Sequence, residues 1–309
     1  MKKTDLAIIG AGVAGFSAAI YGRRFGLDVT IFDPFDGGTI TKTDFIENYP
    51  GFKSILGQEL SEKMKEQALS YKPNFIHSYV SKIEKKDKFF VISTEKEKFE
   101  SKTIILATGT KWKKLGIPGE NELMNKGVHY CATCDAFFYK EKIVAVVGSG
   151  NSTAKDALVL ANTAKKVYII TRRDEIHPEP INLKRVKENK KIETINNTNI
   201  KEIIGDKKLK KIILDRKFNG SNELELDGLF IDIGRSPITE IVESIGVKMN
   251  KNKEIITDKV CQTNIPGFFA AGDVTDIPFK QVVIAASEGS IAAQSAYEFI
   301  TKNHSATYE

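Results

Sequence analysis

The chain lacks the features that mark membrane proteins, disulfide scaffolds and metal proteins. Among its 309 residues no apolar run approaches the roughly 20 residues that a membrane-spanning helix requires. Its three cysteines are too few for a disulfide scaffold. Its four histidines are scattered, and there is no HxxxH and no second CxxC, the spacings at which zinc ligands occur. No apolar signal segment follows Met1, so we expect a cytoplasmic protein without a resident metal.

The charge balance gives no sign of a nucleic-acid partner. The 46 basic and 40 acidic residues leave a formal charge of +6, spread along the chain. The lysine cluster at residues 207–211 has none of the interleaved aromatic residues that a nucleic-acid platform would need. We expect a solvated surface whose mild basicity can help to dock an acidic protein partner. Because a single core seldom grows beyond roughly 250–300 residues, two domains are expected.

A closely spaced cysteine pair is the first candidate for chemistry. Cys131 and Cys134 are separated by two residues and followed directly by Asp135. Such a pair can close a short disulfide, and a neighbouring acid can tune its thiolates, so it can accept and pass on two electrons. Two other interpretations are half of a zinc site and an inert buried pair. We favour the redox pair, because in a reducing compartment a CxxC is more often catalytic than structural.

The N-terminal segment is typical of a dinucleotide-binding unit. Residues 5–9 form an apolar run that predicts a buried strand, and the glycine motif at residues 10–15 and an alanine-rich helix to about Phe25 follow. Glycines at these spacings allow a tight turn, close approach to a pyrophosphate and close packing of helix on strand. The next predicted strand ends at Asp33, whose carboxylate can accept hydrogen bonds from ribose hydroxyls.

Other small-residue turns are expected at the same edge of the first sheet. Two glycine-containing turns, at residues 37–40 and 47–51, come soon after the first unit. Two further predicted strands, at residues 103–106 and 267–271, each stop at a turn that permits a cofactor to approach the backbone. The intervening segments predict an amphipathic helix at 58–71 and paired strands within 78–93.

A second unit repeats the first with one informative change. A predicted strand at residues 143–147 leads into a glycine turn, a helix to about Asn162 and a strand at 167–171. This unit ends in Arg172 and Arg173 where the first ends in an acid. Guanidinium groups at the ribose edge suit a 2′-phosphate, so the sequence favours NADPH over NADH. Thr153 replaces the third glycine and must fit a crowded contact between helix and strand.

The order of these parts predicts an inserted domain. The second unit lies between two parts of the first, so we expect an α/β protein of two Rossmann-like domains, each with three layers (ββα). The expected boundaries are residues 1–116 with 238–309 for the outer domain and 117–237 for the inserted one. The two crossings, near residues 115–119 and 234–237, are where we expect hinges.

These motifs together resemble the low-molecular-weight thioredoxin reductases of bacteria and archaea, class II pyridine nucleotide-disulfide oxidoreductases. The resemblance runs from Asp5 to about Ile300. It implies a homodimeric flavoenzyme with FAD in the outer domain and NADPH in the inserted one, which passes electrons to a disulfide and then to thioredoxin. It also implies that Cys134 lies against the flavin, Cys131 attacks the thioredoxin disulfide and Asp135 supplies a proton. A large domain rotation would bring disulfide and nicotinamide to the flavin in turn.

The resemblance also implies which positions hold the cofactors. Two of them depart from the family pattern: Thr39 stands where a glutamine is usual, and His177 where a third arginine of the phosphate motif is usual. His177 binds phosphate more weakly than arginine near neutral pH. The positions expected at FAD are Gly10, Gly12, Ala14, Gly15, Asp33, Gly38, Thr39, Asn48, Ala107, Thr108, Gly109, Gly272, Asp273, Lys280 and Gln281. Those expected at NADPH are Gly148, Gly150, Asn151, Ser152, Thr153, Arg172, Arg173 and His177.

Three alternatives share these motifs. A related flavoprotein could take electrons from ferredoxin or a reduced deazaflavin, although the nicotinamide motif is retained here. It could also deliver them to another acceptor, as a dithiol oxidase or a peroxiredoxin-system reductase does. A flavin-bound redox sensor would be reduced once and then stall, so steady-state turnover separates it from an enzyme.

Overall fold

The computed structural model describes residues 1–35, 37–43 and 45–305. It divides into two compact units. The first, here called the split unit, comprises Met1–Lys111 and Ser236–Glu309. The second, the inserted unit, comprises Trp112–Arg235. Within the described residues no helix is both long enough and apolar enough to cross a bilayer.

The split unit is built on a seven-stranded sheet in the order β5-β2-β1-β8-β7-β6, with β19 also paired to β8. The strands β5, β2, β1, β8 and β19 are parallel, and β6 and β7 continue the sheet as an antiparallel meander. The last four residues of β1 and of β8, and all residues of β2 and β19, are buried, as expected for parallel strands that are covered on both faces. Their bounds are β1 Lys2–Ile9, β2 Val29–Phe32, β5 Asn74–Ile76, β6 Val80–Lys85, β7 Phe90–Thr94, β8 Lys98–Leu106 and β19 Phe268–Ala270.

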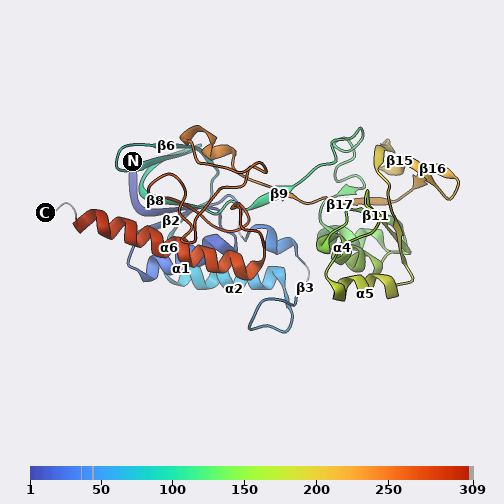
Figure 1. The fold of residues 1–309 in the computed structure, drawn as a ribbon, viewed down its shortest axis with the longest axis horizontal. Coiled ribbons are helices and arrows are strands. Elements are labelled where there is room, and N and C mark those ends of the chain that lie inside the picture. The colour runs from blue at the N-terminus through green and yellow to red at the C-terminus, as the bar shows by residue number, and fades with distance from the viewer. Residues whose placement is uncertain (36, 44, 306–309) are drawn as a thin grey trace. The chain divides into compact units, whose positions relative to one another are not determined.

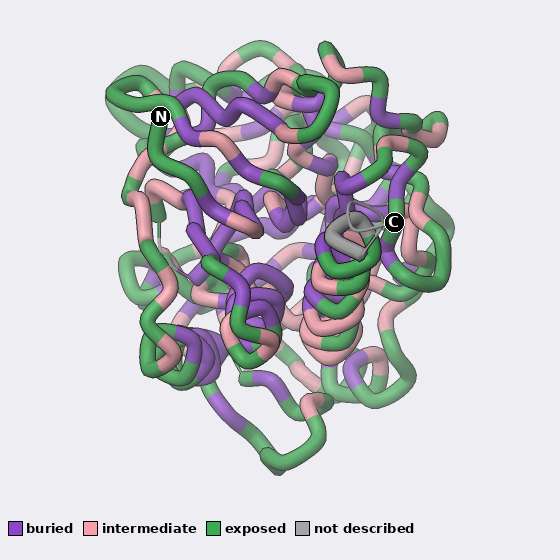
Figure 2. Tube along the Cα trace, turned by 90° about the vertical axis from the view of Figure 1, so that its left-hand side faces the viewer, coloured by how far each residue is buried: buried purple, intermediate pink, exposed green. Residues whose placement is uncertain are grey.

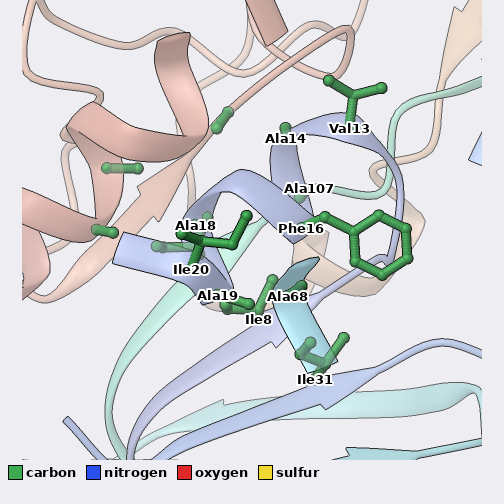
Figure 3. Packing of buried hydrophobic residues seen from close by; sticks show 14 of the residues in the cluster. Ile8, Val13, Ala14, Phe16, Ala18, Ala19, Ile20, Ile31, Ala68 and Ala107 are labelled. Atoms are coloured by element: carbon green, nitrogen blue, oxygen red, sulfur yellow. The ribbon is translucent and has the colours of Figure 1, made fainter. Parts of the chain in front are cut away.

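Three helices pack on this sheet, α1 (Val13–Arg24), α2 (Gly57–Ser70) and α6 (Val282–Ser305), and they lie together in Figure 1. Small side chains let α1 approach its neighbours closely. Figure 3 shows Ala19 of α1 beside Ile8 of β1. Figure 2 shows the buried stretches of the chain enclosed by exposed loops. This packing holds the start of α1 at the carboxyl end of β1, where the first glycine turn lies.

The inserted unit has a five-stranded parallel sheet in the order β10-β17-β11-β12-β13 and a separate antiparallel sheet, β14-β15-β16. Helices α3, α4 and α5 complete its layers, so both units combine a parallel sheet with helices, as the predicted α/β fold class requires. The bounds are β10 Val128–His129, α3 Ala132–Asp135, β11 Ile143–Val147, α4 Asn151–Ala161, β12 Lys166–Ile170, α5 Pro180–Glu188, β13 Ile192–Ile195, β14 Ile200–Gly205, β15 Leu209–Phe218, β16 Ser221–Glu225 and β17 Gly228–Ile231.

The chain crosses between the units on two short strands, β9 (Thr110–Trp112) and β18 (Arg235–Pro237), which pair with each other. The remaining regular elements are β3 (Phe45–Ile46) with β4 (Ile55–Leu56), and the 3₁₀ segments η1 Gly38–Lys42, η2 Ala136–Tyr139 and η3 Glu240–Ile245. The predicted helix at 58–71 is therefore α2, and the predicted strand pair within 78–93 is β6 with β7.

Candidate active site

Cys131 and Cys134 form a disulfide, with their Cα atoms 5.4 Å apart. The pair lies at the start of the short helix α3. Cys131 is the N-cap of that helix, and its Sγ accepts a hydrogen bond from the backbone N–H of Cys134 at 3.2 Å. A backbone donor aimed at sulfur stabilises the thiolate form of that cysteine once the disulfide is reduced.

The disulfide is open to a large partner. Cys134 is exposed and Cys131 is half-buried. Directly after them, Phe137 and Phe138 are 80% and 73% exposed, and their rings meet edge to face with centroids 6.3 Å apart. Together the two rings present apolar surface directly beside the disulfide.

The third cysteine belongs to the core rather than to this site. Cys261 is buried in the split unit, and burial raises the pKa of its thiol to about 12. A thiol that holds its proton so firmly is a poor nucleophile and a poor metal ligand. Among the residues that the structure describes, no group of three His, Cys, Asp or Glu side chains is arranged to hold a metal ion.

Asp135 is held by a histidine that the sequence motifs did not single out. His129 Nδ1 lies 3.0 Å from Asp135 Oδ2, and His129 Nε2 lies 2.6 Å from the Tyr139 hydroxyl. Burial lowers the pKa of His129 and outweighs the opposing effect of Asp135. The position of His129 two residues before the dithiol is a signal in the sequence, but its contact with Asp135 depends on the turn into α3.

Two glycines at the first turn of the split unit, Gly10 and Gly38, have no room for a side chain. Gly10 has a φ of +109°, and a Cβ on it would lie 2.3 Å from the carbonyl oxygen of Ala107. A Cβ on Gly38 would lie 2.9 Å from the Cα of Gly12, so the two glycine loops touch. This bare backbone at the start of α1 fits a pyrophosphate, which needs N–H donors and close approach.

The carboxylate of Asp33 is hydrogen-bonded to the same turn. Its Oδ2 accepts from the backbone N–H of Ala11 at 2.5 Å, and its Oδ1 accepts from the backbone N–H of Phe35 at 2.7 Å. These bonds fix the carboxylate at the end of β2. A carboxylate at this place in a dinucleotide-binding unit is suited to accept hydrogen bonds from ribose hydroxyls.

Asn48 and Gln281, two of the predicted cofactor residues, contact each other within the split unit. The side-chain N–H of Asn48 donates to Gln281 Oε1 at 3.0 Å.

Lys280, a third predicted cofactor residue, bonds to other groups of the protein. Its ammonium donates to the carbonyl oxygens of Asp273 and Thr275 at 3.1 and 2.6 Å and pairs with Glu254 at 3.0 Å. These three partners occupy its three N–H donors, so Lys280 shapes the turn at Asp273.

A buried glutamate also shapes that turn, and the motifs gave no sign of it. Glu288, on α6, accepts from the backbone N–H of Gly272 at 2.7 Å and from Thr275 at 3.4 Å. Burial raises the pKa of Glu288, and the two hydrogen bonds oppose that rise. Gly272 lies close to Ala14, because a Cβ on the glycine would be 3.1 Å from the alanine Cβ.

The second glycine turn lies at the start of α4 in the inserted unit. A Cβ on Gly148 would lie 2.2 Å from the carbonyl oxygen of Asp232, whereas a Cβ on Gly150 would meet nothing within 4 Å. Thr153 fits beneath the turn, 1% exposed, with its hydroxyl donating to the Asp232 carbonyl at 3.2 Å. The crowded contact expected at Thr153 is thus accommodated by a hydrogen bond, and its side chain supports the turn from below.

The segment after β12 folds back over this turn. The backbone N–H of His177 donates to the carbonyl of Ser149 at 2.7 Å. Asn151 Oδ1 accepts from the backbone N–H of Glu179 at 3.2 Å and from the side-chain N–H of Asn182 at 2.8 Å. These bonds hold the segment against the start of α4.

Three predicted phosphate ligands lie on this segment. Arg172, Arg173 and His177 are all exposed. Among the residues that the structure describes, neither arginine forms an ion pair, while His177 Nδ1 lies 3.9 Å from Glu175. Both guanidinium groups are therefore available to an anionic ligand at the end of β12.

The chain matches known proteins along almost its whole length. A family model described as pyridine nucleotide-disulphide oxidoreductase matches residues 4–289. A thioredoxin reductase of Listeria innocua is 37% identical over 302 residues, which cover 97% of this chain and 94% of the relative. The crystal structure of Lactococcus lactis thioredoxin reductase, described as the FR conformation, superposes with a TM-score of 0.93 at 37% identity and covers 97% of this chain and 99% of that one.

A second solved structure agrees with these matches. The thioredoxin reductase of T. acidophilum superposes with a TM-score of 0.91 at 36% identity, covering 96% of this chain and 99% of that one. The chain therefore belongs to the pyridine nucleotide-disulphide oxidoreductases and, within them, to the thioredoxin reductases. It is an oxidoreductase, and its family uses flavin and nicotinamide cofactors, which fits the two bare glycine turns.

Proposed function

We propose that this chain is a thioredoxin-disulfide reductase that passes electrons from NADPH, through FAD and the disulfide of Cys131 and Cys134, to thioredoxin or a thioredoxin-like protein. The observation that carries the proposal is the disulfide itself. It is accessible, it is followed directly by a carboxylate, and it lies in the same unit as a second dinucleotide turn. A bound flavin supplies the two-electron link between nicotinamide and disulfide.

The split unit is the proposed FAD domain. Backbone N–H groups at the start of α1, beside Gly10 and Gly12, would hold the pyrophosphate, and Asp33 would hold the ribose. The pair formed by Asn48 and Gln281 would line the flavin end of the site. The turn at Asp273 would be held in place for the cofactor by Lys280 and by Glu288.

The inserted unit is the proposed NADPH domain. The turn at Gly148 and Gly150 would hold the second pyrophosphate, and Arg172 and Arg173 would bind the 2′-phosphate through charge-assisted hydrogen bonds. His177 is tied by its backbone to the turn, so its ring lies near the same edge and can add a third contact.

The dithiol would deliver electrons by thiol–disulfide exchange. The Cys131 sulfur attacks the partner disulfide, which breaks as a mixed disulfide forms, and the departing partner sulfur takes one proton. The Cys134 sulfur then attacks Cys131, the internal disulfide re-forms, and the second partner sulfur takes the other proton. Two electrons and two protons thus leave the chain together. Asp135 is the proposed proton carrier.

The exposed rings of Phe137 and Phe138 support a protein as the acceptor. They lie immediately beyond the dithiol and present an apolar surface of the kind that interfaces cover. A small-molecule acceptor would not need such a surface. The reducing cytoplasm is the compartment that we expect for this exchange.

We also propose a homodimer. An apolar groove in the split unit is lined by residues of and near α1 and α6 that include Phe25, Ile291 and Phe299. Apolar surface of this kind suits contact with a second copy of the chain.

Anaerobic titration of the flavin-loaded protein with NADPH, NADH and reduced ferredoxin tests the proposed donor. We expect NADPH to bleach the flavin absorbance fastest. Bleaching by reduced ferredoxin alone would replace the donor with the ferredoxin alternative and leave the thioredoxin acceptor in place. Bleaching without multiple turnover on thioredoxin would favour a redox sensor.

A further inference from the structure

A buried hydrogen-bonded chain connects Asp135 to the interior of the inserted unit. The hydroxyl of Tyr139, on η2, lies 2.6 Å from His129 Nε2, and His129, on β10, presents Nδ1 to Asp135 Oδ2 at 3.0 Å. The His129 side chain is 9% exposed, whereas that of Asp135 is 28% exposed. The chain thus runs from a closed interior to a carboxylate that reaches solvent beside the disulfide.

The chemistry of the three groups fixes the direction of both hydrogen bonds. Burial in the first place, and the negative charges of Asp135 and Asp227 in the second, raise the pKa of Tyr139 to about 12, so its hydroxyl keeps its proton and donates to Nε2. Burial also lowers the pKa of His129, which keeps the ring neutral. A neutral ring that accepts at Nε2 carries its proton on Nδ1 and donates it to Asp135.

We propose that His129 is a positioning residue of the dithiol centre, which together with Tyr139 holds the Asp135 carboxylate in the orientation that moves a proton between the thiols and a departing partner sulfur. This inference rests on the proposed thiol–disulfide exchange. His129 acts through Asp135 and not by direct contact with the reacting partner.

The proton balance shows why orientation matters. As Cys134 attacks the mixed disulfide, its thiol proton passes to Asp135, and the same proton then passes from Asp135 to the sulfur that leaves. Asp135 is therefore a deprotonated carboxylate both before and after the exchange. A carboxylate that rotated freely would still carry charge, but it would spend less time in the one orientation that exchanges a proton with sulfur.

If His129 had only a structural role, its loss would change the rates with different disulfide substrates in another way. Its ring also packs on Phe230, with centroids 5.3 Å apart, so it contributes to the core of this unit. Loss of packing alone would slow all disulfide substrates alike. Loss of proton delivery would slow mainly those whose departing sulfur needs a proton, because a thiol of low pKa leaves readily without one.

The test therefore compares two small disulfides on the chemically reduced protein in single-turnover mixing. Hydroxyethyl disulfide releases a basic alkyl thiolate, and 5,5′-dithiobis(2-nitrobenzoate) releases an aromatic thiolate that is stable without a proton. We expect His129→Phe to slow the reaction with hydroxyethyl disulfide about tenfold, a part of the factor typical of general acid catalysis. The reaction with the aromatic disulfide should slow less than about twofold, because its leaving group needs no proton.

Two further variants separate positioning from packing. His129→Asn places an amide near the position of Nδ1 and should restore most of the rate, since it can still donate to Asp135. In an Asp135→Asn background, His129→Phe should cause no additional loss, because residues that act through one another are not additive. Tyr139→Phe should give a smaller loss than His129→Phe.

Equal slowing of both disulfides, or additive losses in the double variant, would overturn the positioning role. These reactions need neither flavin, nicotinamide nor thioredoxin. A protein that shows the expected contrast but fails to turn over thioredoxin would therefore refute the proposed function and leave His129 in its role at the dithiol.

Discussion

At the scale of single residues, the proposed electron transfer requires that Cys131 and Cys134 lie in a different environment from Cys261. Cys131 and Cys134 are joined in an accessible disulfide, while Cys261 is buried with a thiol that keeps its proton. Cys134→Ser should leave flavin reduction by NADPH intact and abolish thioredoxin reduction, because the internal disulfide can no longer form. Cys261→Ser is the matched control and should retain activity. Thioredoxin turnover by the Cys134→Ser variant would refute the relay.

The buried His129 predicts a pH dependence of stability. Burial holds the pKa of His129 below its ordinary value of 6.5 in the folded chain, with Asp135 opposing and Tyr139 donating to the neutral ring. Below about pH 6.5 the unfolded chain therefore binds a proton that the folded chain does not, and the free energy of unfolding falls as the pH drops further. Above that pH this contribution is fully present.

Urea unfolding at about pH 7.5 and about pH 5.5, on either side of the ordinary histidine pKa, measures the effect. The drop in midpoint between the two values should be smaller in His129→Asn than in the parent chain. His177 is exposed, so His177→Asn should leave the drop unchanged. An equal drop in His129→Asn and the parent would show that the ring is not held neutral.

At the scale of elements, the two glycines of the second turn should behave differently. A Cβ on Gly148 would overlap the carbonyl of Asp232, so Gly148→Ala should destabilise the inserted unit by about 1–3 kcal/mol. A Cβ on Gly150 meets only open space, so Gly150→Ala should change stability by less than about 0.5 kcal/mol. It should nevertheless weaken NADPH binding, because the added methyl group occupies the approach to the pyrophosphate.

Thermal unfolding and NADPH titration of both variants check this contrast. Normal NADPH affinity in Gly150→Ala would show that the nucleotide does not approach the backbone at this turn.

Arg172 and Arg173, at the end of β12, should determine the preference for NADPH over NADH. Arg172→Ala and Arg173→Ala should each lower kcat/KM for NADPH roughly tenfold to a hundredfold, as expected for loss of a hydrogen bond between charged groups. The value for NADH should stay nearly constant, because NADH lacks the 2′-phosphate. Arg216 is likewise exposed, on β15, and Arg216→Ala is the matched control. Parallel losses with both nucleotides would remove the phosphate assignment.

At the scale of the whole molecule, the sequence predicted the elements that follow local rules. The strand β11 has the predicted bounds of 143–147, and α2 differs from the predicted helix by one residue at each end, because periodicity and glycine turns are local signals. A redox pair was favoured for the CxxC over half of a zinc site and an inert pair, and the structure shows the two cysteines joined in a disulfide. The fold class followed from the order of two repeated units, which needs no knowledge of packing.

The supporting side chains could not be predicted because their contacts join distant parts of the chain. Glu288 meets Gly272 only because α6 packs across that turn. Lys280 meets Glu254 from an earlier loop as well as the nearby carbonyls of Asp273 and Thr275, and a short motif does not contain that ion pair. Thr153 was expected to crowd its site, and only the structure shows that its hydroxyl donates to Asp232.

The central claim is that electrons from NADPH reach the disulfide of Cys131 and Cys134. The chain has three cysteines, of which only Cys261 is free in the oxidised protein. The decisive measurement is a count of thiols in the flavin-loaded protein, denatured and alkylated before and after anaerobic addition of NADPH. The account predicts a rise from one thiol to three per chain. A count that stays at one while the flavin is reduced would contradict it.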